Sequence, residues 1–514
     1  MSRFDKKIIV SLETTCARVN CIRLFGLVLL LCAFTACLFG QQRDLTWSSS
    51  NRALDVLKAS IAAYGGIDRI NSIKSIQVIA SGSSIHRTQS RRIRPPFDRD
   101  PYRIETYIDL DEDRIRHSSA GGFPGGFEFR QTLLIRDNIA RVIDSNEGTF
   151  TSGPSALPTF VSYRLKWLPQ FALVAAFERL NHTRYLGQFT AGERKFDVVT
   201  FAEHDGSQIG LEIDTKTRLI SKITMLGGDL LLGDAVIDLR FSNYRMIQGH
   251  PTPMKRARGV GGETIEVLTI GNFGINKKLD SSTFSVPAEL RAPASIKEKL
   301  PMKVGQNAYL VNGGGYNVLA IGFRDHIMIV EAPLNDVVSE NVINQVKRLF
   351  PNRPVKYVAV THHHDDHAGG IRAYIDEGAT VITTIGNQTY FKSISARRSR
   401  QSPRPIRNKQ DSISFDLVSR SGSKVFSDGI TAVEFHDIGI GPHADEMLVV
   451  YLPHEKTIFQ GDLLNRSSGG RLLVNETTLH FAKWLETKRF ELNLILPVHG
   501  EPISMDHFTN AVKK

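Results

Sequence analysis

Cysteine is almost absent from this sequence of 514 residues. The only four cysteines lie within the first 37 residues, at Cys16, Cys21, Cys32 and Cys37, and positions 38 to 514 contain none. This absence excludes a disulfide framework, a thiolate metal site and a cysteine nucleophile from the body of the chain. Any metal ion bound there must be held by histidine, aspartate or glutamate.

Long hydrophobic runs are also scarce. The exception is Leu24–Phe39, sixteen residues without a charge. A membrane-spanning helix needs about 20 residues, whereas this length suits the core of a signal peptide. We therefore predict that residues 1–40 are a signal peptide or N-terminal anchor, and that the chain is exported to the periplasm or attached to a membrane facing it. Cleavage after Gly40, lipidation at Cys37 and an uncleaved anchor are three alternatives.

The sequence also lacks a strong excess of one charge sign. Charged residues make up 23% of the chain, and the net charge is +11. Residues 1–40, with five basic and two acidic side chains, supply +3 of this charge. Such a mild surplus does not require a nucleic-acid partner, and we predict none. The hydrophobic share of 41% is ordinary for a globular protein, and the length predicts two to four domains.

Residues 45–288 contain a long series of strand-like runs bounded by turn signals, with one interior helix predicted over Phe160–Leu180. This pattern predicts a β-rich domain whose antiparallel sheet curls over an apolar helix or groove. Examples of the predicted strands are Ile76–Ile85, Tyr102–Leu110, Phe196–Ala202, Ile209–Ile213, Leu219–Met225, Ala235–Phe241 and Thr264–Ile270.

Short motifs in this region resemble the half-barrel of periplasmic lipoprotein carriers. They are Ala62–Gly66, Ser75–Gly82, Phe241–Arg245 and Ile275–Pro287. The resemblance implies an apolar concave face able to hold a lipid-like chain. The alternative is a packed β-domain with no ligand.

Beyond a linker predicted over residues 289–305, residues 306–514 alternate short strands and helices. Val338–Leu349 is amphipathic and Ile371–Ile375 precedes a glycine stop, so both are predicted helices. The predicted strands are Val318–Ile321, His326–Val330 and Val355–Val360. The fold class of the whole chain is therefore α+β, with a β-rich domain followed by an α/β domain.

The strongest chemical signal is a cluster of metal-binding side chains directly after the buried strand that ends at Val360. The segment Thr361–Gly370 has the pattern H-x-H-x-D-H, with His362, His364, Asp366 and His367 within six residues. His362 and His364 alternate, so both can face one metal ion, while Asp366 and His367 can face a second. The cluster lies between a strand and a helix, which is not typical of a histidine-rich storage tract.

This motif resembles that of the metallo-β-lactamase superfamily, and the likeness continues along the chain. His443 follows a strand and the Gly439–Gly441 loop, Asp462 ends the segment Thr457–Asp462, and His499 lies in Leu496–Gly500. The resemblance implies a four-layer αβ/βα fold with the metal site at the edge of two facing sheets.

The resemblance also implies a set of ligands. Metal one would take His362, His364 and His443; metal two would take Asp366, His367 and His499; and Asp462 would bridge the two. Seven nitrogen and oxygen ligands suit two Zn²⁺ ions, with iron able to replace zinc at one or both positions. Two cations lower the pKa of a shared water, and Asp366 is predicted to orient the resulting hydroxide and take its proton.

We therefore expect an exported dinuclear zinc hydrolase acting on an ester, lactone, thioester, amide or related bond of a small-molecule substrate. His364 is not glutamate, which argues against the diiron flavoprotein oxidoreductases of the superfamily. The 36 residues between Asp462 and His499 leave no room for the large insert of its nucleic-acid-cutting members. Many β-lactamases of the superfamily use a cysteine ligand, which this part of the chain lacks, and this argues against β-lactamase activity itself.

Two other functions are compatible with the same motif. One is a mononuclear iron oxidoreductase of the sulfur-dioxygenase type, and the other is an apolar-ligand binding protein with a non-catalytic metal site. The remaining histidines of this half are expected to be surface or packing residues, whereas Asp445 and Glu446 could line the pocket. Those histidines are His326, His436, His454, His480 and His507.

Overall fold

A computed structural model describes residues 46–146, 148–154, 164–203, 206–290, 301–396, 413–466 and 472–513. The chain divides into two compact units. The smaller comprises residues up to Ile67 together with Gln170–Ser221, and the larger comprises Asp68–Pro169 together with Lys222–Lys514. The predicted leader lies outside the described residues, as does most of the predicted linker, so export and lipidation stay predictions. Among the described residues, no helix is long and apolar enough to cross a membrane.

The smaller unit packs helices against a short antiparallel sheet. A helix over residues 46–63 buries Val56, Leu57 and Ile61. Its C-terminal turn is tied to the rest of the unit, because Ser60 Oγ donates to Arg218 O at 2.7 Å. The unit also contains α4 (Phe171–Glu178), η2 (Leu180–His182) and the strands β7 (Arg184–Ala191), β8 (Arg194–Ala202) and β9 (Gln208–Asp214).

The single helix predicted over Phe160–Leu180 is wrong in its extent. Residues 164–167 form one helical turn, and α4 begins only at Phe171. Pro169 lies between the two, and proline cannot donate the backbone hydrogen bond that a continuous helix requires. Residues 155–163 lie outside the described part of the chain.

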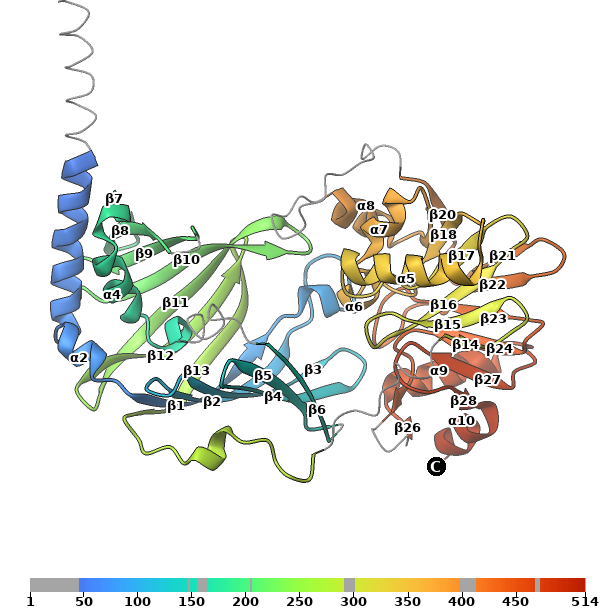
Figure 1. The fold of residues 1–514 in the computed structure, drawn as a ribbon, viewed down its shortest axis with the longest axis horizontal. Coiled ribbons are helices and arrows are strands. Elements are labelled where there is room, and N and C mark those ends of the chain that lie inside the picture. The colour runs from blue at the N-terminus through green and yellow to red at the C-terminus, as the bar shows by residue number, and fades with distance from the viewer. Residues whose placement is uncertain are drawn as a thin grey trace, which may run out of the picture. The chain divides into compact units, whose positions relative to one another are not determined.

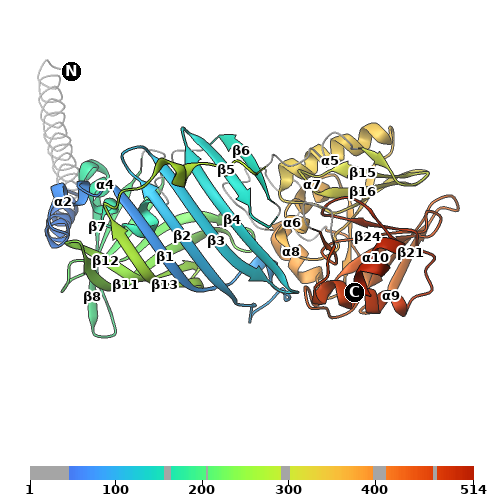
Figure 2. The same ribbon diagram turned by 90° about the horizontal axis from the view of Figure 1, so that it is seen from below.

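The larger unit begins with α2 (Ile67–Asn71) and a broad antiparallel sheet. Its strands follow the order β6-β5-β4-β3-β2-β1-β13-β12-β11-β10, and β1 pairs with both β2 and β13. Figure 2 shows β1 to β4 running side by side in chain order. The strands are β1 (Ser75–Ser84), β2 (Asp100–Asp109), β3 (Arg114–Phe123), β4 (Phe127–Arg136), β5 (Ile139–Asp144), β6 (Thr149–Pro154), β10 (Ile220–Asp229), β11 (Gly233–Ile247), β12 (His250–Val260) and β13 (Glu263–Ile275), with η1 (Arg87–Gln89) and η3 (Ser281–Phe284) beside them.

A group of charged and polar side chains is buried within this sheet. Arg256 is 1% exposed, forms an ion pair with Glu266 and lies 4.0 Å from the centre of the Trp167 ring. His117 on β3 is also buried, with Nδ1 2.7 Å from Thr106 Oγ1. Burial lowers the pKa of His117 to about 3, and the positive charges of Lys166 and Arg256 add to this effect.

The lowered pKa of His117 predicts a loss of stability in acid. Unfolding restores an ordinary pKa near 6.5, so the unfolded chain gains a proton below that pH while the folded chain gains one only near pH 3. At pH 5 the contribution to the free energy of unfolding is about 2 kcal/mol smaller than at pH 7.5. Urea unfolding of His117→Gln at the two pH values should show a smaller difference than the wild type. The exposed His507→Gln is the control, and an unchanged pH dependence in His117→Gln would contradict the prediction.

The C-terminal part of the larger unit has the predicted four-layer αβ/βα fold. Helices α5, α7 and α8 cover the outer face of the first sheet, and α9 and α10 cover the outer face of the second (Figure 1). Three apolar clusters fill the spaces between these four layers. Leu319, Phe435 and Phe459 are among the residues buried between the two sheets.

The first sheet has the order β14-β15-β16-β17-β18-β19-β20, and its strands β17 to β20 are parallel. Its elements are β14 (Met302–Lys303), β15 (Ala308–Asn312), β16 (Asn317–Gly322), β17 (Ile327–Val330), α5 (Asp336–Leu349), β18 (Val355–Ala359), α6 (Asp365–Ala368), α7 (Ile371–Asp376), β19 (Thr380–Thr384), α8 (Gln388–Ala396) and β20 (Phe415–Val418).

The second sheet has the order β21-β22-β23-β24-β27-β28. Its elements are β21 (Ser423–Ser427), β22 (Ala432–Asp437), β23 (Leu448–Leu452), β24 (Thr457–Gln460), α9 (Glu476–Glu486), β27 (Leu494–Pro497), β28 (Ile503–Ser504) and α10 (Met505–Val512), with the small pair β25 (Asn465–Arg466) and β26 (Leu472–Leu473) apart. The ends of β18, β22, β24 and β27 lead into the segments that carry the predicted metal ligands.

Candidate metal centre

The H-x-H-x-D-H motif connects β18 to the short helix α6. His364 is the N-cap residue of α6, with φ −61° and ψ 146°, and residues 361–363 form a bend before it. His362 and His364 face one centre, with their rings 4.4 Å apart, whereas His363 packs on Tyr390 with their rings 5.3 Å apart.

Two glycines after the motif allow close contact with neighbouring backbone. A Cβ atom on Gly369 would lie 2.2 Å from Leu334 O, and one on Gly370 would lie 2.5 Å from Asn335 O. Any larger residue would push this segment away. The glycines thus let the start of α7 lie against the backbone of Leu334 and Asn335, directly after the histidine cluster.

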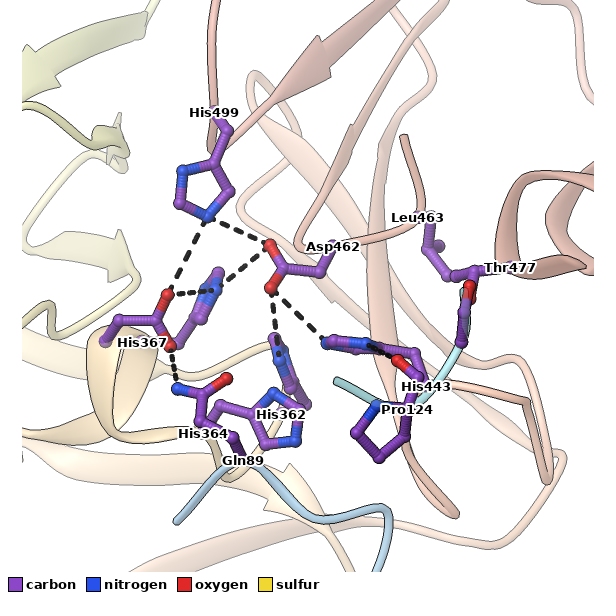
Figure 3. Close-up of polar contacts among 12 residues, drawn as sticks. Gln89, Pro124, His362, His364, His367, His443, Asp462, Leu463, Thr477 and His499 are labelled. Atoms are coloured by element: carbon purple, nitrogen blue, oxygen red, sulfur yellow. Dashed lines mark hydrogen bonds and ion pairs between the residues drawn. The ribbon is translucent and has the colours of Figure 1, made fainter. Parts of the chain in front are cut away.

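A first group of candidate ligand atoms comes from both sheets. It consists of His362, His364, His443 and Asp462, whose ligand atoms lie within 4.8 Å of one another. His443 comes from the loop between β22 and β23, and Asp462 lies two residues after the end of β24. Asp462 Oδ2 lies 3.3 Å from His443 Nε2 and 3.9 Å from His362 Nε2 (Figure 3).

A second group shares the same aspartate. It consists of Asp366, His367, Asp462 and His499, again within 4.8 Å. Asp462 Oδ1 lies 3.0 Å from His499 Nε2 and 3.1 Å from His367 Nε2. Asp366 Oδ2 lies 3.5 Å from His367 Nε2 and 3.8 Å from His499 Nε2. The two oxygens of Asp462 therefore face different groups, and all seven predicted residues come together.

The donor atoms of these groups fit a cation. His362 Nε2, His364 Nδ1 and His443 Nε2 are buried and have no hydrogen-bond partner within the described chain. Leaving a buried polar nitrogen without a partner costs about 1–3 kcal/mol. Three such nitrogens that converge beside one carboxylate oxygen are the arrangement expected of ligands for Zn²⁺ or a similar ion.

Burial and neighbouring side chains shift the pKa values of the residues in the cluster. Burial lowers the pKa of His362 and His364, and neighbouring histidines add to this, so both imidazoles are neutral. Burial opposes ionisation of Asp462, but His367 and His499 outweigh it and hold the pKa of Asp462 well below its usual range. Neutral imidazole and ionised carboxylate are the forms that bind cations.

The predicted catalytic residue, Asp366, is held by two neighbours. Gln89 Nε2 donates to Asp366 Oδ1 at 2.8 Å and to Asp365 Oδ1 at 2.5 Å. The Tyr316 hydroxyl also hydrogen-bonds to Asp366. The Tyr316 ring lies 4.7 Å from that of His499. Burial raises the pKa of Tyr316, and the carboxylates of Asp366 and Asp462 raise it further, so the phenol stays protonated.

Two of the candidate ligand histidines are held by backbone carbonyls from loops that connect strands of the broad N-terminal sheet. His443 Nδ1 lies 2.9 Å from Pro124 O (Figure 3). His364 Nε2 lies 3.1 Å from Ser90 O. A carbonyl only accepts, so each of these nitrogens is the N–H donor. The other nitrogen of each ring therefore carries the lone pair.

Sequence reasoning did not identify Gln89, Ser90, Pro124, Tyr316 or Glu331. Glu331 directly follows β17, is fully buried, and has Oε2 3.5 Å from His367 Nδ1. Its φ of 91° is unusual for a residue with a side chain. An acidic residue at the end of a fully apolar strand was the one available signal, since a buried carboxylate requires a partner.

Residues outside the motif take the expected packing roles. His326 stacks on Phe323, and His436 lies 3.0 Å from Glu434. Asp445 and Glu446 line a cavity of about 470 Å³ together with Arg92, Arg94 and other residues. Two lining residues are hydrogen-bonded to each other, because Asp445 N donates to Arg91 O at 2.9 Å. Most of the arginine-rich segment 392–410 lies outside the described residues.

The comparisons with known proteins concern this C-terminal region. Residues 334–499 match the family model of the Metallo-beta-lactamase superfamily. A metallo-beta-lactamase from Pontibacter korlensis is 19% identical, with 41% of this chain and 96% of that chain covered and a TM-score of 0.31. The stereoselective inverting sec-alkylsulfatase Pisa1 from Pseudomonas sp. is 16% identical, with 41% and 40% covered and a TM-score of 0.31. The metallo-beta-lactamase FIM-1 from Pseudomonas aeruginosa, in a mono-zinc form, is 18% identical, with 41% and 86% covered and a TM-score of 0.28.

The C-terminal region of this chain matches the metallo-β-lactamase superfamily over residues 334–499. The family model and the four-layer fold with its histidine and aspartate cluster agree on this assignment. The strand-rich N-terminal region lies outside the matched residues, and its resemblance to lipoprotein carriers stays a prediction.

Proposed function

We propose that this protein is a hydrolase that holds two zinc ions in the groups around Asp462. The observation that carries the proposal is the shared carboxylate. Asp462 Oδ2 faces His362 and His443, whereas Oδ1 faces His367 and His499. A carboxylate that lies between two sets of ligand atoms can hold two cations close together, as two-metal hydrolytic sites require.

The ligand sets follow the two geometric groups. His362, His364 and His443 would hold one ion, and Asp366, His367 and His499 the other, with Asp462 shared. When bound, such ions lower the pKa of water towards neutrality and polarise a substrate carbonyl or phosphoryl oxygen.

The chain's own residues supply positioning and proton transfer. Asp366 Oδ2 faces the second group, so it is placed to accept a proton from attacking water. The protonated Tyr316 phenol, beside His499, donates its hydrogen bond to Asp366 and so keeps this proton acceptor in position. The side chain of His499 is 42% exposed, more than Asp366 at 21% or Asp462 at 11%, so substrate approaches from its side.

The cavity lined by Asp445 and Glu446 also contains four arginines, and each of them has a partner. Arg92 lies 3.8 Å from Asp445, and Arg94 donates to Thr389 Oγ1 at 3.0 Å. Arg91 pairs with Asp98, and Arg420 pairs with Glu446. A guanidinium has five N–H donors, so these pairings leave donors for an anionic group of a substrate, and such groups are included in the test below.

Metal content and metal removal test the proposal. Full-length protein purified without chelator should contain two metal ions per chain, mainly zinc, by elemental analysis. It should hydrolyse at least one compound in a screen of esters, lactones, thioesters, β-lactams and phosphoesters, each tested as a neutral and an anionic analogue. Chelation should abolish the activity and added Zn²⁺ should restore it, because the ions supply the polarisation and the low-pKa water.

Two results would contradict the proposal. A metal stoichiometry near zero in metal-replete protein would show that the chain has no dinuclear site. One iron per chain together with oxygen uptake would identify a sulfur-dioxygenase-type oxidoreductase instead.

A further inference from the structure

The loop after β1 is firmly attached to the broad N-terminal sheet. Arg87 in η1 is 8% exposed and lies 2.5 Å from Asp229 and 3.5 Å from Glu263, which belong to β10 and β13. Ser90 Oγ donates to Asp98 Oδ2 at 2.7 Å, which closes the loop on itself. Gln89 and Ser90 therefore lie in a loop that contacts with the N-terminal sheet hold in place.

This loop approaches both groups of the metal centre. Gln89 Nε2 donates a hydrogen bond to Asp366 Oδ1, so the other oxygen, Oδ2, faces His367 and His499. Ser90 O accepts from His364 Nε2, which leaves His364 Nδ1 directed to the first group.

The turn between β3 and β4 makes a third contact. Pro124 O accepts from His443 Nδ1, so His443 Nε2 faces Asp462. The turn is clamped in place, because Thr477 Oγ1 donates to Gly125 O at 2.8 Å. Gly125 has φ +93°, and a Cβ atom there would lie 2.2 Å from Thr477 Oγ1 and 3.0 Å from His443 Cβ. No other residue type fits this turn without displacing it.

We propose that the loop Arg87–Arg91 and the turn Pro124–Gly126 are positioning elements of the metal centre, so that the N-terminal sheet sets the affinity of the C-terminal domain for its cations. This inference rests on the proposed function. Three hydrogen bonds fix the orientation of one ligand carboxylate and the lone-pair nitrogen of two ligand imidazoles. Loss of such outer partners typically weakens metal binding 10–100-fold.

If these contacts had only a structural role, their loss would have a different effect. Contacts that only join the sheet to the domain would, when lost, lower the stability of the chain and affect both cations alike. Positioning contacts affect the cation whose ligand they hold. Gln89 contacts Asp366 of the second group, whereas Pro124 contacts His443 of the first, so the two roles can be separated.

The experiment titrates full-length, metal-free protein with Co²⁺ against a competing chelator. The affinity of each site and the visible absorption spectrum of the bound Co²⁺ are measured. Gln89→Leu should weaken the second site about 10–100-fold and leave the first within about twofold. Gln77→Leu is the matched control, because Gln77 lies on β1 of the same sheet and donates to Tyr107 OH, away from the cluster.

A second variant tests the turn. Gly125→Ala should displace Pro124 O and weaken the first site about 10–100-fold, with a changed Co²⁺ spectrum. Gly148→Ala is its control, because Gly148 also has a positive φ, +63°, but has open space around it. Thermal unfolding of the metal-free proteins identifies any variant that fails to fold, in which case Thr477→Val replaces Gly125→Ala.

Wild-type affinities and spectra in both Gln89→Leu and Gly125→Ala would overturn the inference, as would an equal weakening of both sites in each variant. If the wild-type chain itself binds no Co²⁺, the proposed function fails first. The two failures are therefore distinct.

Discussion

Asp462→Ala is expected to lose the second cation and to reduce hydrolysis on the order of 10²–10⁴-fold while the chain remains folded. The reason is that Asp462 is the one residue that belongs to both groups. Its removal leaves His367 and His499 without the carboxylate oxygen that lies 3.0–3.1 Å from them. A loss of several kcal/mol of transition-state stabilisation corresponds to that range of rates. Elemental analysis and the rate on the best substrate from the screen measure the effect.

The exposed Asp506 on α10 provides a matched control. Asp506→Ala should keep both metals and the full rate. Retention of two metals and of activity in Asp462→Ala would show that Asp462 does not bridge.

Asp366→Ala should be at least as damaging as Asp462→Ala. Asp366 contributes a ligand oxygen to the second group and is also the residue placed to accept a proton. Its substitution therefore removes metal binding and proton transfer together. Asp366→Asn separates the two functions, because it keeps an oxygen in place but cannot take the proton. We expect Asp366→Asn to retain more of the second metal than Asp366→Ala, with a similar loss of rate.

Asp365→Asn is the comparison for this variant. Asp365 is adjacent in sequence and accepts from the same Gln89 amide, but it belongs to neither group. It should retain both metals. If Asp365→Asn and Asp366→Asn lose the same rate and the same metal, the effect arises from the Gln89 contact and not from a distinct role of Asp366.

The ligand cluster could be predicted because its residues follow a sequence order that reflects the fold. His362, His443, Asp462 and His499 each follow the end of a buried strand, and the ends of neighbouring strands meet at one edge. The predicted strands and helices of this domain also agree with α5, α7, β16, β17 and β18 to within a few residues. Apolar runs of this kind are recognisable because burial on both faces requires them.

The N-terminal region was less predictable for physical reasons. β3 carries His117, Ser118 and Ser119, so its polar residues conceal the alternation that a strand usually shows. Pro169 was a visible signal against one long helix over Phe160–Leu180. It interrupts that helix because proline lacks the backbone N–H that a helix interior requires.

No pattern in the sequence indicated the three positioning contacts of Gln89, Ser90 and Pro124. Ser90 and His364 are 274 residues apart, and Pro124 and His443 are 319 apart. Two of the three contacts use backbone carbonyls, which every residue type possesses. Only the register of β1, β3 and β4 in the folded sheet brings these atoms to the cluster.

The order of the ligands along the chain determines when a newly made polypeptide can hold its cations. Gln89 and Pro124 are synthesised long before the histidines they contact, but β1 cannot pair with β13 until residue 275 has been made. Asp462 and His499 are made after the H-x-H-x-D-H segment, so a growing chain first carries that segment without the carboxylate that joins the two groups. If the proposed function holds, the second cation can be captured only once His499 has been made, and chains truncated before His499 cannot complete that site.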